Sequence, residues 1–142
     1  MSMLIAAFMF IPLLALAFSH LLWAMGRTWP IRNEALLAQT VIGRPGIDRI
    51  ARLPSLALAV FFLAAGILAL ALADHDSGAL PLTLVGLPPA ALFLARGFAG
   101  YTPGWAQKTP DPIFRLNDRR VYSPLCLFLG FGFVALVLMR LL

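Results

Sequence analysis

Four long apolar blocks divide the sequence, and they limit the possible folds more than any other feature. They cover about residues 3–23, 53–73, 80–98 and 124–141. Each block is close to the roughly 20 residues that an α-helix needs to cross the hydrocarbon core of a bilayer. Charged residues make up only 12% of the chain, against about 25% in soluble domains. The sequence therefore predicts an all-α polytopic membrane protein, a single domain of four transmembrane helices.

The basic residues are concentrated in two of the connections, loops 26–52 and 99–121, whereas the turn at residues 74–78 is acidic. Loops rich in Lys and Arg stay on the cytoplasmic side of a membrane. We therefore predict that both basic loops are cytoplasmic and that the N and C termini share the opposite side. Topology and contact with anionic membrane lipids account for the net charge of +5. We expect no nucleic-acid partner.

A polar segment leads into the last block. Its reactive or charged side chains are those of Asp118, Arg119, Arg120, Tyr122 and the single cysteine, Cys126. Ser123 followed by Pro124 is typical of a helix start, because serine caps free N–H groups and proline at the first position loses no hydrogen bond. The last span is therefore predicted to begin at this pair.

Three further polar or amphipathic side chains are predicted at the same depth in the membrane. His20 and Trp23 lie near the cytoplasmic end of the first block, and Arg96 lies near the cytoplasmic end of the third. Ionisable residues inside spans are costly and usually face the bundle interior, so they are candidate functional residues. Trp23 suits the membrane–water boundary.

Each candidate has a functional and a structural interpretation. His20 can accept a proton or bind a metal or haem, or it can simply hydrogen-bond to another span. Arg96 can clamp an anionic group, or pair with Asp118. Asp118 can act as a base or orient His20 instead, and Tyr122 can be an acid or a boundary phenol. Cys126 has no CxxC partner and is most simply a packing residue.

The same residues resemble the signature of the DUF3995 family, small four-span bacterial membrane proteins of unknown function. The resemblance rests on His20 to Ala24, on Arg96 with Gly97, and most specifically on the segment from Phe114 to Leu127. It covers almost the whole chain and implies a multi-pass protein of the bacterial inner membrane. The family supplies no reaction and no cofactor.

The connections carry signals of their own. Residues 33–41 are predicted as a short helix in the membrane interface, and residues 47–53 as a second amphipathic segment. In the third block, Pro88 and Pro89 follow Gly86, which predicts a bent or locally open helix. The adjacent Asp74, His75 and Asp76 make a poor metal cage, so no metal site is predicted.

Three functions are compatible with these features. The first is a binding protein with a cytoplasmic-side interfacial pocket for an anionic lipid or amphiphile, using Trp23, Arg96, Arg119, Arg120 and Tyr122. The second is a small membrane enzyme that performs acid–base chemistry on a lipid-like substrate, with His20, Asp118 and Tyr122 as catalytic candidates. The third is an accessory subunit of a membrane complex, or a homo-oligomer. The sequence indicates no particular cofactor.

Overall fold

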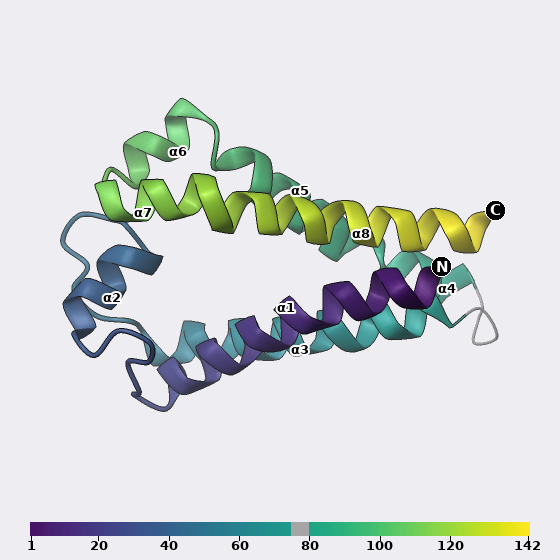
Figure 1. Ribbon diagram of the computed structural model, residues 1–142, viewed down its shortest axis with the longest axis horizontal. Coiled ribbons are helices and arrows are strands. Elements are labelled where there is room, and N and C mark those ends of the chain that lie inside the picture. Colours follow the sequence, from purple (N-terminus) through teal and green to yellow (C-terminus); the bar gives the residue numbers. More distant parts are fainter. Residues whose placement is uncertain (75–79) are drawn as a thin grey trace.

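The computed structural model describes residues 1–74 and 80–142, and its secondary structure over those ranges is entirely helical. Four helical stretches are long and apolar enough to cross a membrane: Ser2–Ala24, Arg52–Ala73, Leu80–Ala99 and Pro112–Leu141. The predicted all-α class with four candidate transmembrane helices is confirmed. The two termini lie at the same end of the bundle (Figure 1). The side of the membrane that this end faces stays a prediction.

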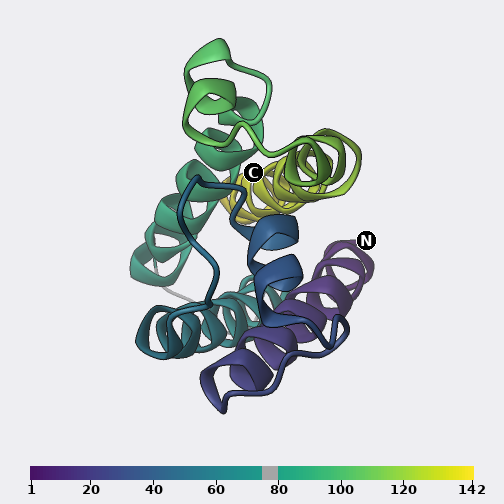
Figure 2. The same ribbon diagram turned by 90° about the vertical axis from the view of Figure 1, so that its left-hand side faces the viewer.

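The spans form two antiparallel pairs. Helix α1 (Ser2–Ala24) packs along α3 (Arg52–Ala73), and α5 (Leu87–Ala99) packs along α8 (Ser123–Leu141). The pairs lie close together at the end that holds the termini, here called the closed end, and diverge toward the opposite, loop end (Figure 1). At the loop end, α2 (Glu34–Val41) lies between the two pairs (Figure 2).

On α1 and α8, burial along the inward face follows this divergence. On α1, Ala6, Met9 and Leu13 are 0% exposed, whereas His20, further along the same face, is only half-buried. On α8, the fully buried Leu129 and Phe133 give way to a half-buried Cys126. The apolar core therefore occupies the closed half of the bundle.

Aromatic rings mark the boundary between the closed core and the loop end. The ring centroid of Phe93 on α5 lies 6.1 Å from that of Phe133 on α8 and 6.2 Å from that of Phe62 on α3. The Phe62 ring in turn lies 5.1 Å from the imidazole of His20 on α1. We call His20, Phe62, Phe93 and Phe133 the ring cluster. Because it takes one ring from each span, it links the two helix pairs.

The third span is interrupted, as its glycine and prolines predict. It consists of α4 (Leu80–Val85) and α5, separated at Gly86. A Cβ atom at Gly86 would stand 2.7 Å from a methyl carbon of Val137 and 2.9 Å from one of Leu72. Glycine is needed at this position because two neighbouring spans approach the backbone closely.

The helix that carries the last apolar block does not begin at Ser123, so the predicted helix start and cap at this residue are wrong. Helix α7 (Pro112–Asn117) continues through a π-helical turn, Asp118–Tyr122, directly into α8. Ser123 has helical backbone angles and makes no capping bond. The capping role falls to Asp111, whose carboxylate accepts hydrogen bonds from the N–H groups of Ile113 and Phe114. An aspartate before proline is an equally good start signal, and Asp111 lies twelve residues before Ser123 in the printed sequence.

Of the two amphipathic segments predicted in the first loop, only one is a helix in the structure. Asn33 caps α2 by accepting from the N–H of Leu36 at 3.1 Å, so the short helix is confirmed. The segment from Ile47 to Ala51 is not helical, and α3 begins only at Arg52. Of the predicted acidic turn, residues 75–78 lie outside the described residues. Another short helix, α6 (Pro103–Lys108), belongs to the second loop.

The contact between α5 and α8 depends on small residues, and this yields a prediction. A Cβ atom at Gly130 would lie 2.9 Å from the backbone nitrogen of Leu94, which cannot move aside as a side chain can. Gly130→Ala should therefore lower the free energy of unfolding by about 1–3 kcal/mol, as overpacking usually does. Denaturant titration in detergent micelles, followed by circular dichroism, would measure it. Gly104→Ala is the matched control, because a Cβ there meets nothing within 4 Å. Equal stability of the two variants would contradict the prediction.

Candidate functional site

The π-helical turn before α8 sets the geometry of the site. Pro124 has no N–H group, and its ring would clash with the carbonyl four residues earlier in a regular α-helix. Here the turn is wider, and the N–H of Ser123 reaches the carbonyl of Asp118, five residues back. The two side chains consequently share one face, and the Ser123 hydroxyl donates to Oδ1 of Asp118 at 3.1 Å. Turns of this kind often occur at functional sites.

Asp118 is the centre of a polar cluster at the loop end. It is 2% exposed, and its Oδ1 accepts from Nη2 of Arg96 at 2.6 Å. Its other oxygen, Oδ2, accepts from Nε1 of Trp105 at 3.0 Å. Nη1 of Arg96 also donates to the Ser123 hydroxyl at 3.4 Å. We call Arg96, Trp105, Asp118 and Ser123 the Asp118 cluster. It joins α5, α6 and the start of the last span.

The guanidinium of Arg96 is held from two directions. Besides its contacts with Asp118 and Ser123, its Cζ lies 4.5 Å from the ring centre of Trp105, which is a cation–π geometry. The predicted pairing of Arg96 with Asp118 is confirmed. Removing either partner from a buried ion pair leaves an uncompensated charge, whereas the net stabilisation by the intact pair is small. The cluster therefore fixes where α5, α6 and α8 meet more than it adds stability.

Gly100 makes this approach possible. A Cβ atom there would collide with the Ser123 hydroxyl and stand 2.9 Å from Oδ2 of Asp118. Trp105 is the member of the cluster that sequence reasoning missed. It lies in a loop where neither periodicity nor a motif distinguishes a hydrogen-bond donor from a boundary tryptophan. Only the folding of α6 back over Asp118 identifies its role.

His20 and Asp118 do not share partners. Nδ1 of His20 lies 2.8 Å from the carbonyl oxygen of Leu16, and its ring contacts are with Trp23 on α1 and Phe62 on α3. Both oxygens of Asp118 accept from other groups, so the carboxylate does not orient the histidine. The structure thus provides no acid–base dyad from these two residues.

Tyr122 and Trp23 form hydrogen bonds that hold the first loop against the bundle. The Tyr122 hydroxyl donates to the carbonyl of Thr40 at 3.1 Å, and its ring centre lies 5.8 Å from that of Phe114. Nε1 of Trp23 donates to the carbonyl of Trp29 at 2.7 Å. These bonds give both residues a structural role at the loop end. Cys126 is a half-buried free thiol that packs against the apolar core.

Arg119 and Arg120 differ from Arg96 in that both are exposed. Within residues 1–74 and 80–142, the ion pair between Arg96 and Asp118 is the one salt bridge present. The remaining basic side chains of the two loops consequently have no acidic partner in that part of the chain. The loop end therefore presents a surplus of positive charge.

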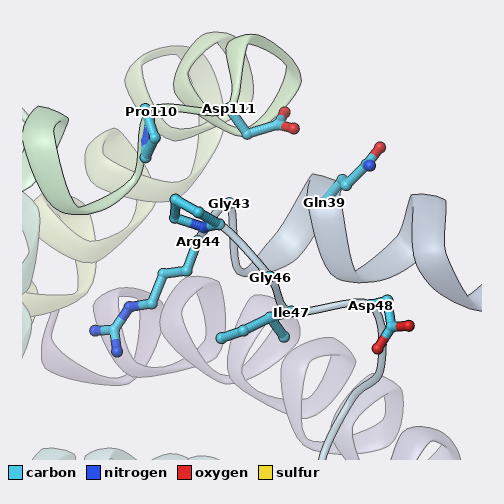
Figure 3. A pocket seen from close by; sticks show the side chains of 9 residues that line it. Gln39, Gly43, Arg44, Gly46, Ile47, Asp48, Pro110 and Asp111 are labelled. Atoms are coloured by element: carbon cyan, nitrogen blue, oxygen red, sulfur yellow. The ribbon is translucent and has the colours of Figure 1, made fainter.

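An open groove at the loop end lies apart from the predicted site residues. It is an open hollow of about 480 Å³ between the α2–α3 connection and the turn before α7 (Figure 3). Arg44, Asp48 and Asp111 are its charged lining residues, and they point in different directions (Figure 3). The space beside Asp118 and Trp105 is too narrow to admit a water molecule. Among the described residues, no three His, Cys, Asp or Glu side chains gather as metal ligands would.

Comparison with known proteins gives one match. The family model described as "Protein of unknown function (DUF3995)" matches residues 13–133, which include the ring cluster and the Asp118 cluster. No curated protein and no solved structure matches the chain. The match confirms the resemblance carried by His20, Arg96 and the segment from Phe114 to Leu127.

The Asp118 cluster leads to a double-mutant prediction. Asp118→Ala leaves the Arg96 guanidinium and the Trp105 N–H without their acceptor. It should lower the free energy of unfolding by about 2–4 kcal/mol. The lower part of this range applies if water partly solvates the Arg96 guanidinium, which is not fully buried. The double variant Asp118→Leu with Arg96→Met should be less damaging than Asp118→Ala, since no buried charge is left unpaired.

The measurement is denaturant titration in a single detergent, with Arg119→Ala as the matched control. That variant also removes an arginine, but one with no acidic partner, so its effect should stay within about 0.5 kcal/mol. A double variant that is at least as unstable as Asp118→Ala would contradict the account of a coupled pair.

Proposed function

We propose a membrane-binding function for this chain, which belongs to the DUF3995 family of proteins of unknown function. The protein binds an anionic lipid or amphiphile at the loop end of its four-helix bundle, on the side predicted to be cytoplasmic. The observation that carries the proposal is the uncompensated positive charge of the two loops, placed where the spans end. Each basic residue near an anionic membrane surface contributes about 1 kcal/mol of attraction.

Arg119 and Arg120 are the best-placed side chains for this contact. They project from the π-helical turn, are exposed, and have no acidic partner among the described residues. Tyr101 is exposed beside them, and its hydroxyl lies 3.4 Å from the carbonyl of Arg119. An aromatic ring next to arginines suits the head-group level of a bilayer, because the ring contacts the acyl boundary while the guanidinium binds phosphate.

The other predicted ligand residues have internal partners, which refines the proposal. Arg96 is engaged by Asp118, Tyr122 by Thr40, and Trp23 by Trp29. We assign these three residues to building the loop end, and the exposed arginines to contacting the anionic group. An enzyme using His20 with Asp118 is less well supported, because those side chains have separate partners.

A binding experiment tests the assignment. Purified protein in a non-ionic detergent would be titrated with dioctanoyl phosphatidylglycerol and, separately, with zwitterionic dioctanoyl phosphatidylcholine. We expect tighter binding of the anionic lipid, weakened by Arg119→Gln with Arg120→Gln by about tenfold or more, at about 1 kcal/mol per arginine. Raising the salt to about 1 M should remove most of the preference, because the Debye length falls to about 3 Å.

The matched control is Arg44→Gln with Arg49→Gln. It removes the same charge from the other loop, where both arginines are also exposed. If binding depends on a site at Arg119 and Arg120, this control loses less affinity than the test variant. Equal losses would reduce the proposal to non-specific charge attraction, and no preference for the anionic lipid would overturn it.

A further inference from the structure

The second ring nitrogen of His20 is free to bind a ligand. A carbonyl oxygen only accepts hydrogen bonds, so Nδ1, at 2.8 Å from the carbonyl of Leu16, must carry the proton. In the neutral ring Nε2 is then an acceptor. No described residue is bonded to it. No buried side-chain nitrogen or oxygen in the described part of the chain lacks a partner, so Nε2 must reach the molecular surface.

His20 lies on the inward face of α1. His20 follows Met9 by eleven residues in the sequence, which is about three helical turns and keeps the two side chains on one face. Met9 is fully buried, and its side chain fills the space where a Cβ atom at Gly132 of α8 would stand. His20 therefore lies on the face of α1 that is directed toward the other helix pair, and near the C-terminal end of this helix. The two pairs diverge toward that end of α1 (Figure 1).

The surroundings of the imidazole are aromatic and uncharged. The ring centres of Trp23 and Phe62 lie 4.7 and 5.1 Å from that of His20. The Phe62 ring contacts that of Phe93, which contacts that of Phe133, so rings from the three other spans lie on the closed side of the histidine. The acceptor thus lies beside surfaces suited to stacking against another ring.

We propose that His20 binds the hydroxyl group of a neutral ring-bearing amphiphile, a phenol or quinol in chemical class. The hydroxyl donates to Nε2, and the ring packs against Trp23 and Phe62. A charged ammonium donor fits less well, because no carboxylate among the described residues is paired with His20, and an uncompensated charge in apolar surroundings is costly. This inference extends beyond the proposed function, since it involves neither Arg119 nor Arg120 and needs no charge on the ligand.

A comparison of two ligands tests it. Para-hexylphenol donates a hydrogen bond, whereas para-hexylanisole, its methyl ether, has the same ring and tail but no donor. Calorimetric titration of the full chain in detergent should give a dissociation constant about three to ten times lower for the phenol, the factor expected for one net hydrogen bond.

Substitutions then locate the acceptor. His20→Phe keeps a ring against Trp23 and Phe62 but removes Nε2, so the difference between the two ligands should disappear. His20→Gln places an amide oxygen near the position of Nε2 and should restore part of it. Gly104→Ala, remote from this region and unobstructed by any atom within 4 Å, should leave the difference unchanged.

Two results would overturn the inference. One is equal affinity of the phenol and the ether for the unmodified protein. This measurement does not depend on the folding of any variant. The other is that His20→Phe weakens the binding of both ligands equally and keeps the preference for the phenol. That result is expected if His20 has only a structural role. Because both probes are uncharged, neither result bears on the anionic-lipid proposal.

Discussion

The buried carboxylate of Asp118 is the interaction on which the loop end of this protein depends. Its two oxygens accept hydrogen bonds from α5, α6 and the last span. The donors are the guanidinium of Arg96, the indole of Trp105 and the hydroxyl of Ser123. A charge removed from water needs such partners, and losing one of them costs more than the pair contributes. The contact therefore specifies how the helices meet, at a point where glycine at position 100 is needed for them to do so.

The closed end is held together mainly by apolar packing. There the inward faces of the spans are fully buried, and apolar packing with close approach at Gly86 and Gly132 holds the two helix pairs together, while Gly130 lets α5 and α8 pack within one pair. In lipid the packing of small residues replaces the hydrophobic driving force that acts in water. The ring cluster lies between this core and the diverging loop end. One end of the bundle is thus closely packed, while the other carries the polar groups.

This division explains why two binding chemistries are proposed at the same end. The exposed arginines of the π-helical turn offer charge to a head group, while His20 offers an acceptor between aromatic rings to an uncharged hydroxyl. The first contact lies on the outer surface and depends on ionic strength. The second lies on the inward face of α1 and depends on a tautomer that the backbone of Leu16 fixes.

The sequence by itself determined the class and the span count, because a bilayer imposes a length and an apolar composition that no other environment requires. It also identified the break at Gly86 and the short helix near residues 33–41, and it offered the pairing of Arg96 with Asp118 as one of two interpretations. It did not predict the unbroken path from Pro112 to Leu141, since Ser123 and Pro124 carry a start signal that fits a π-helical turn equally well. Two features were decided only by tertiary structure. The contact of Trp105 with Asp118 depends on how α6 folds back over the last span, and the separation of His20 from that carboxylate depends on how the helix pairs diverge. Residue spacing within one helix carries no information about that divergence.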